Sequence, residues 1–215
     1  MLIGVLLAVG QWDFKRLLAY HSISQIGYVV LGIGIGTPLG ILGGLFHLFN
    51  HSVFKSLLFL NSGGVVYATG TRDLKKLGGL KEKMPVTEKT CLTASMSISG
   101  IPPFNGFWSK LIIIIACIQA GHAGYAFWAF VGSVLTLASF MKVQRYVFYG
   151  KLPKDHEGIK EVPSTMQTSM IALALVCLLG GLLLLFPCRE YFLQPAVNVL
   201  RDGIKYAECV MRLVK

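Results

Sequence analysis

Residues 40–64 read GILGGLFHLFNHSVFKSLLFLNSGG, a stretch that is apolar enough to span a bilayer and yet contains His47, His51 and Lys55. These three residues are four positions apart, so on a helix they occupy one face at successive turns. Ionisable groups at bilayer depth cost roughly 2.5–3.5 kcal/mol each on insertion scales and usually face a partner or a water-filled cavity. Because imidazole changes charge near neutral pH, a row of two imidazoles and an amine can pass protons along. The stretch therefore predicts a transmembrane helix that carries part of a proton pathway.

A purely structural role for the same row is the alternative. The two histidines would then satisfy backbone carbonyls inside a helix bundle, and Lys55 would extend its ammonium group to the membrane surface. Three ionisable residues in register within one apolar span favour the proton pathway.

The composition is that of a membrane protein. Of the 215 residues, 54% are hydrophobic and only 14% are charged, against about 25% charged residues in soluble domains. The net charge of +10 would suggest nucleic-acid binding in a soluble chain, but no nucleic-acid-binding motif accompanies it. The five cysteines are scattered and form no CxxC pair, so neither a metal site nor a disulfide framework is indicated. No cofactor motif is present, and the lack of a phosphate-binding glycine motif argues against use of ATP.

The hydropathy pattern predicts an all-α polytopic membrane protein. We expect an N-terminal half-span, about five full transmembrane helices and an amphipathic C-terminal helix, divided into a transmembrane domain at 1–187 and a tail at 188–215. The helix after residue 37 is long enough to need a tilt or a break, for which Gly63-Gly64 is the expected place. Gly180-Gly181 in the last span indicates close packing against a neighbour. The apolar segments are 1–10, 17–36, 38–69, 90–120, 125–149 and 167–186.

The span at 90–120 is interrupted by Gly100, Pro102 and Pro103. Two prolines after a glycine cannot continue the hydrogen-bond ladder, so this span is expected to be a discontinuous helix. Broken helices at membrane depth flank the ion sites of transporters. Lys110 lies about two turns beyond the break and before an apolar run, so we expect it to be buried in the ion pathway. An interfacial anchor is the alternative role for Lys110. Apart from the loops, we expect no acidic residue in the spans.

Among the loops that connect the predicted spans, positive charge is concentrated on one side of the membrane. The loops on that side, at 11–16, 70–89 and 142–165, hold thirteen lysines and arginines, whereas the opposite loops, near 37–38 and 121–124, hold none. This bias predicts a multi-pass protein of the cell inner membrane with its basic loops cytoplasmic and its C-terminus external. The basic residues are Lys15, Arg16, Arg72, Lys75, Lys76, Lys81, Lys83, Lys89, Lys142, Arg145, Lys151, Lys154 and Lys160.

The tail after Pro187 is predicted to form one amphipathic helix. Its apolar stripe could lie on the bilayer or along a partner helix, and the sequence does not choose between them. The stripe consists of Leu193, Val197, Leu200, Ile204, Ala207, Met211 and Val214.

Three motifs in order resemble the antiporter-like membrane subunits of complex I, energy-converting membrane-bound hydrogenases and multisubunit sodium/proton antiporters. The motifs are QWDFKRLLAYHSISQIGYVVLG, HLFNHSVFKSLLFLNSGGV and GIPPFNGFWSK, and the similarity runs from residue 5 to residue 153. The resemblance implies two inverted helical repeats in a whole subunit, each with a broken helix and a central lysine. It also implies that protons move along a hydrated axis of lysines, histidines and acids, driven by redox chemistry in partner subunits.

When the motifs are matched, Lys110 corresponds to the family's lysine on the broken helix of the second repeat. The row at 47–55 corresponds to the family's helix that carries two histidines and a lysine. Asp13 and Lys15 match the polar turn before the next helix. The pathway residues implied are His47, His51, Lys55 and Lys110, with support from Asp13, Lys15, Pro102 and Pro103.

The resemblance begins inside the second repeat, so we expect another polypeptide to supply the first repeat. A split subunit, a half-sized subunit and a fragment all remain open. The expected function is translocation of protons or sodium within a redox-driven membrane complex whose iron–sulfur clusters lie in partner subunits. The alternatives are a non-pumping structural or assembly subunit and, more weakly, a dimeric solute transporter. The sequence leaves open the ion, the redox complex and the electron donor.

Overall fold

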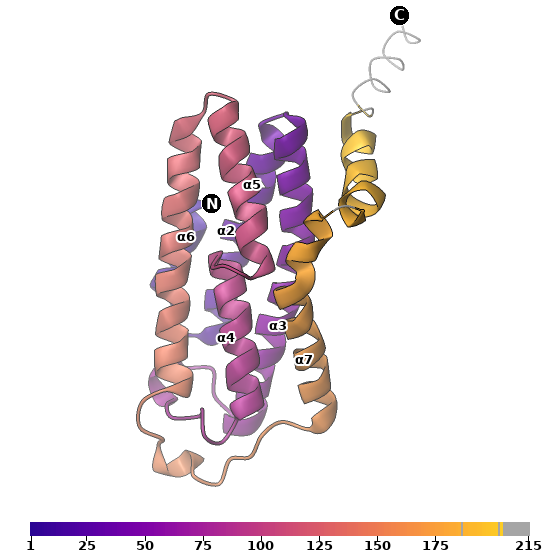
Figure 1. Cartoon of the computed structure of the whole chain (residues 1–215). Coiled ribbons are helices and arrows are strands. Elements are labelled where there is room, and N and C mark those ends of the chain that lie inside the picture. Colours follow the sequence, from indigo (N-terminus) through magenta and orange to yellow (C-terminus); the bar gives the residue numbers. More distant parts are fainter. Residues whose placement is uncertain (186, 202, 204–215) are drawn as a thin grey trace, which may run out of the picture.

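A computed structural model describes residues 1–185, 187–201 and 203. The regular elements of this part of the chain are all helical, and the longer helices run roughly parallel in one bundle (Figure 1). The elements are α1 (Leu2–Val9), α2 (Phe14–Gly34), α3 (Pro38–Thr69), η1 (Leu74–Lys76), α4 (Pro85–Ser99), α5 (Asn105–Gln119), α6 (Ala123–Val143), η2 (Gln144–Phe148), η3 (Lys154–His156), α7 (Ser164–Leu179), η4 (Gly180–Leu184) and η5 (Arg189–Leu193).

The all-helical prediction is confirmed. Three stretches are long and apolar enough to cross a membrane, namely Phe14–Gly34, Ala123–Phe148 and Ser164–Leu184, and Asn105–Gln119 is a shorter apolar helix. The largest apolar core joins α2, α3, α4 and α6 near the end of the bundle that carries the basic loops. Its bulkiest fully buried side chains are Phe14, Leu17, Leu18, Phe54, Leu57, Leu58, Leu74, Leu80, Phe140 and Phe148.

Helix α3 is continuous over its 32 residues, so the expected break at Gly63-Gly64 is wrong. The Thr37 side chain caps its start by accepting a hydrogen bond from the amide of Gly40, and Gly70 ends it in the left-handed conformation. At 1.5 Å per residue the helix is about 48 Å long, which exceeds a hydrocarbon core of about 30 Å. Gly64 instead leaves space for the side chains of Val162 and Met170, so the glycine allows Val162 and α7 to pack closely against α3.

The discontinuous helix is confirmed. Helix α4 ends at Ser99 and α5 begins at Asn105, and Gly100 closes α4 with φ 80° while its amide donates to the carbonyls of Met96 and Ser97. Across the break, the Ser97 hydroxyl donates to the Asn105 side-chain oxygen. The two half-helices are therefore joined by a buried side-chain hydrogen bond.

The start of this span differs from the prediction. Helix α4 begins at Pro85, five residues earlier than expected, because proline at the first helical position is already set for a helix. Glu88 thereby lies in the first turn of α4 and is only 4% exposed. Helix α4 therefore carries an acidic residue in its first turn, which the predicted start at residue 90 assigns to the preceding loop.

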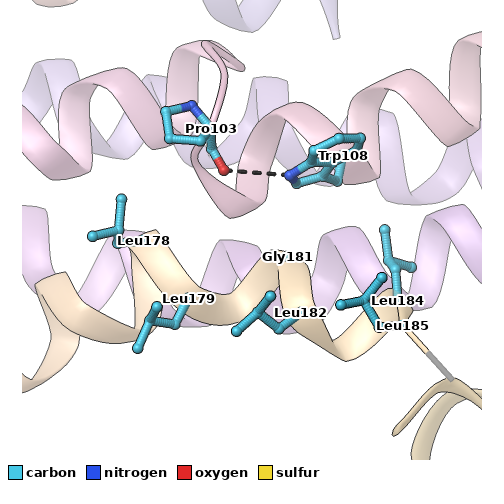
Figure 2. Close-up of a pocket in the computed structure, with 8 residues that line it drawn as sticks. All are labelled: Pro103, Trp108, Leu178, Leu179, Gly181, Leu182, Leu184 and Leu185. Atoms are coloured by element: carbon cyan, nitrogen blue, oxygen red, sulfur yellow. Dashed lines mark hydrogen bonds between the residues drawn. The ribbon is translucent and has the colours of Figure 1, made fainter. Parts of the chain in front are cut away.

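Gly180-Gly181 packs closely, as predicted, and its neighbour is α5 of the same chain. A Cβ atom on Gly181 would lie 2.6 Å from the Trp108 ring, and one on Gly180 would lie 3.1 Å from Asn105 Cβ. Figure 2 shows Gly181 facing Trp108 across this contact. The contact holds α7 and η4 against the first turns of α5.

The first part of the predicted tail stripe also packs on this chain. Leu193 and Val197 are buried in a cluster with Ile41, Leu42 and Phe46 of α3. Leu200 is exposed at 42%. Four residues of the predicted stripe lie outside the described residues: Ile204, Ala207, Met211 and Val214.

Gly106→Ala is expected to destabilise the junction of the half-helices. An added Cβ would overlap the backbone carbonyl of Ser97, which cannot move aside as a flexible side chain would. Overpacking of this kind typically costs about 1–3 kcal/mol. The check is thermal unfolding of the purified variant. Gly63→Ala, with nothing within 4 Å of its added Cβ, is the matched control. Equal melting temperatures for the two variants would contradict this account of the break.

Candidate functional site

His47 is the point at which three helices meet through side-chain hydrogen bonds. It lies on α3 and is fully buried. Its Nδ1 atom is 2.8 Å from the Ser109 hydroxyl on α5, and its Nε2 atom is 3.2 Å from the side-chain oxygen of Gln25 on α2. The predicted pathway histidine is thus connected to the broken helix through Ser109, the residue next to Lys110.

The neighbours of His47 can serve both of its charge states. The Gln25 oxygen only accepts hydrogen bonds, so Nε2 donates to it. In the neutral ring, Nδ1 accepts from the Ser109 hydroxyl; in the charged ring, Nδ1 donates to that oxygen. The hydroxyl then donates to the Gly106 carbonyl, which is 3.2 Å away. A proton can therefore be added or removed without leaving these partners unsatisfied.

Lys110 is buried beside the helix break, with 3% of its surface exposed. Its ammonium group donates to the Ile98 carbonyl at 2.7 Å and lies 4.6 Å from the centroid of the Tyr28 ring. Ile98 belongs to the last turn of α4, where backbone carbonyls carry the negative end of the helix dipole. Among the residues that the structure describes, Lys110 forms no ion pair, so a carbonyl and an aromatic face stabilise its charge.

Lys55 lies on the same helix as His47, two turns towards the basic loops, and is 6% exposed. Its ammonium group donates to the Leu18 carbonyl of α2. One turn further along α2, the Nε2 atom of buried His21 lies 2.9 Å from the Ser139 hydroxyl on α6. Lys55 is therefore bonded to α2 one turn away from a second buried histidine.

Helix α2 supplies a second polar row, to which the sequence analysis assigned no role in the pathway. His21 and Gln25 are four residues apart and both fully buried, and Gln25 contacts His47. Their spacing is the same signal that singled out the row on α3. The row could therefore have been found from the sequence, whereas Ser109 and Ser139 become visible only when the helices are packed.

His51 is half-buried and differs from its neighbours in the row. Its Nε2 atom has no hydrogen-bond partner among the described residues, and its ring meets Phe54 edge-on with 5.6 Å between the centroids. The structure therefore brings His47 and Lys55 into interhelical contacts and leaves His51 at the edge of the cluster.

The polar turn before α2 is held by Asp13. Its carboxylate accepts a hydrogen bond from the Arg16 amide at 2.9 Å, capping α2, and pairs with Arg72 at 3.3 Å. Lys15 is exposed. Asp13 thus ties the start of α2 to the loop that follows α3, and none of its hydrogen bonds or ion pairs among the described residues involves His47 or Lys110.

Asp13→Ala is expected to lower stability by about 0.5–2 kcal/mol, the usual cost of losing a helix cap. The ion pair with half-exposed Arg72 adds little to this cost. Thermal unfolding checks the prediction, with Lys15→Ala as the matched control at an exposed neighbouring position. An equal loss of stability in Lys15→Ala would contradict the capping role.

The outer face of the helix break is apolar. Pro103 and Trp108 form one wall of a groove of about 380 Å³, and leucines of α7 and η4 form the other (Figure 2). The Trp108 indole nitrogen donates to the Pro103 carbonyl at 3.3 Å, which closes the linker between the half-helices. Pro102 lies in the same linker. None of the described residues that line the groove is ionisable.

Comparison with known proteins gives a consistent result. A family model described as "NADH:quinone oxidoreductase/Mrp antiporter, TM" matches residues 1–136. A Na(+)/H(+) antiporter subunit of Alkalihalophilus pseudofirmus is 38% identical over 212 residues, which are 99% of this chain and 43% of that protein. Formate hydrogenlyase subunit 3 of Escherichia coli is 35% identical over 201 residues, which are 83% of this chain and 33% of that protein.

The fold is matched in the same group of proteins. A chain of the Mrp complex from Dietzia sp. superposes with a TM-score of 0.86 at 30% identity, covering 97% of this chain and 47% of that one. The chain therefore spans less than half the length of the proteins it resembles.

Proposed function

Because this chain belongs to the NADH:quinone oxidoreductase/Mrp antiporter transmembrane family, we propose that it is a proton- or sodium-translocating module of a redox-driven membrane complex. The names of two relatives, a sodium/proton antiporter subunit and a formate hydrogenlyase subunit, support an ion-translocating role beside redox chemistry. No redox step is assigned to this chain; iron–sulfur clusters are proposed for its partner subunits.

The observation that carries the proposal is the setting of His47. Its partners can satisfy both the neutral and the charged imidazole, which is what a proton relay needs. We propose that protons pass between Lys55 and Lys110 through His47, and that half-buried His51 connects this row to the surface of the chain. The charge on each lysine would be switched by the charge on its neighbours.

A non-pumping structural or assembly subunit is the second candidate. The bonds of His47 to α2 and α5 favour it, because they also hold three helices together. Against it stands the cost of burying Lys55 and Lys110 without a carboxylate partner in the described part of the chain. Apolar side chains of similar size would hold the same helices at lower cost.

We propose five full membrane crossings and one half-crossing. The three apolar stretches α2, α6–η2 and α7–η4 would be joined by α3 and by the broken pair α4–α5, and α1 would be the half-crossing. The charge bias supports an inner-membrane protein with cytoplasmic basic loops and an external C-terminus. Residues 1–187 would form the membrane domain, and 188–215 the tail.

The proposed partners are other membrane subunits, among them a segment that carries the first antiporter repeat. Gentle purification from the native membrane, followed by mass spectrometry, tests this directly. We expect membrane subunits and redox subunits with iron–sulfur clusters to accompany the chain. Recovery of the chain without any redox or antiporter-like partner would favour a scaffold and contradict the proposal.

A further inference from the structure

A buried carboxylate outside the pathway described above lies near the end of the bundle that carries the basic loops. Glu88 of α4 accepts a hydrogen bond at 3.2 Å from the hydroxyl of Tyr149, the residue that follows η2. Its position in the first turn of α4 suggests a helix cap. That place is taken by Glu161, whose carboxylate accepts from the amides of Val86 and Thr87 at 2.8 and 3.2 Å. Glu88 therefore needs another explanation.

Tyr149 connects Glu88 to a polar hollow at the surface. The hollow has a volume of about 240 Å³, and its lining includes Lys81, Glu82 and Tyr149 together with two glycines, Phe148 and Leu152. The Lys81 ammonium group lies 4.8 Å from the centroid of the Tyr149 ring. At about 30 Å³ per molecule, the hollow is large enough for several waters. Glu88 is thus separated from a wettable surface by one side chain.

Beyond Glu88, polar groups continue along α4 towards the helix break. The Gln144 carbonyl accepts from the Tyr149 amide at 3.2 Å, and the Gln144 side-chain amide donates to the Ser95 hydroxyl at 3.2 Å. Gln144 is 3% exposed, and its side-chain oxygen has no partner among the described residues. Buried amide oxygens of this kind are usually satisfied by ordered water.

The row ends at Lys110. The Ser99 hydroxyl donates to the Ser95 carbonyl at 2.6 Å. The carbonyl of Ile98, the residue before Ser99, accepts a hydrogen bond from the Lys110 ammonium group. Glu88 and Ser95 are seven residues apart, which places them on one face of α4, about 10 Å from each other. Polar groups of α4 thus extend from Glu88, beside the surface hollow, to Ser99, the residue after the one whose carbonyl binds Lys110.

We propose that Glu88 is a proton-loading group at the inlet of a route that runs between α4 and α6–η2 to Lys110. The Tyr149 hydroxyl passes its proton to the Glu88 carboxylate, forming an O–H bond there, and takes a replacement proton from hydronium in the hollow, which is left as water. The proton then passes through water beside Gln144 and Ser95 to the Lys110 amine, and the carboxylate is regenerated. This inference rests on the proposed function. It adds that Lys110 receives its proton from the end of the bundle that carries the basic loops.

Glu88→Gln in the full complex tests the inlet. Glutamine keeps the size of the side chain and an acceptor for Tyr149, so a purely structural Glu88 would tolerate it. Transport in membrane vesicles, normalised to the amount of assembled complex, is expected to fall by roughly 100-fold, a modest value for loss of a positioned proton donor. Glu157→Gln, at an exposed loop position, is the matched control and is expected to transport like the wild type.

Lys110→Ala in the same assay separates this inference from the proposed function. Wild-type transport in Glu88→Gln, together with lost transport in Lys110→Ala, would overturn the inlet and leave the function standing. Wild-type transport in Lys110→Ala would overturn both. If Glu88→Gln does not assemble, Gln144→Met tests the inlet in its place, because the proposed route passes beside Gln144. Slower transport in the assembled Gln144→Met complex would support the inlet, and an unchanged rate would overturn it.

Discussion

Lys110→Ala is expected to abolish coupled ion transport while the complex still assembles. The Lys110 ammonium group is buried next to the helix break, where it is bonded to the Ile98 carbonyl and faces the Tyr28 ring. A pathway that crosses this point needs a group that gains and loses a charge there, and alanine offers none. The measurement is ion transport in membrane vesicles, divided by the amount of assembled complex on a native gel.

Stability separates the transport role of Lys110 from a structural one. A buried amine without a carboxylate partner is costly to remove from water, so an apolar replacement of similar volume is expected to be neutral or stabilising. Lys110→Met is therefore expected to melt no lower than the wild type and still to lose transport. Loss of assembly in both variants would contradict the transport role.

Lys142→Met is the matched control for Lys110. Lys142 also donates to backbone carbonyls, those of Val9 and Gln11 at 2.7 and 2.6 Å, but it lies at the end of α6. We expect its replacement to loosen the turn between α1 and α2 and to leave transport close to the wild-type rate. Equal losses of transport in the two lysine variants would show that fold disruption, not the pathway, explains the effect.

His47→Phe is expected to have the second largest effect. Phenylalanine fills the space of the ring but cannot take up a proton, so transport between Lys55 and Lys110 should stop. The change also leaves the buried side-chain oxygen of Gln25 without its partner, at about 1–3 kcal/mol, whereas the Ser109 hydroxyl can still donate to the Gly106 carbonyl. The same vesicle assay measures transport, and thermal unfolding of the complex measures the accompanying loss of stability.

His47→Gln and His122→Gln complete this test. Glutamine at position 47 can still bond to both neighbours but cannot relay a proton, so we expect better stability than with phenylalanine and equally poor transport. His122 is exposed between α5 and α6, and its replacement is expected to change neither property. Full transport in His47→Gln would exclude His47 as a relay.

The features that were predicted correctly depend on local rules. The row of ionisable residues on α3 follows from a spacing of four, and the break before α5 follows from Gly100, Pro102 and Pro103. Backbone sterics and helical periodicity act over one or two turns, so they can be seen in a short stretch of sequence. The close packing at Gly180-Gly181 also follows from the absence of side chains there.

The features that were missed or wrong depend on tertiary packing. The partner of Gly181 is Trp108 of the same chain, and Gly64 packs against the last helix without breaking α3. The hydroxyl of Ser109 gains its role only because α5 lies against α3 at that level. Glu88 looked like a loop residue because it stands among basic residues that precede the apolar run, although Pro85 starts the helix before it.

The most direct test of ion translocation uses the purified complex in sealed liposomes. A pH-sensitive dye and a sodium indicator inside the liposomes report the ion while the redox reaction runs. We expect a gradient of one of the two ions with the wild-type chain, and none with Lys110→Ala at an equal content of assembled complex. Redox turnover in sealed wild-type liposomes without a gradient of either ion would contradict the account, as would an equal gradient with Lys110→Ala.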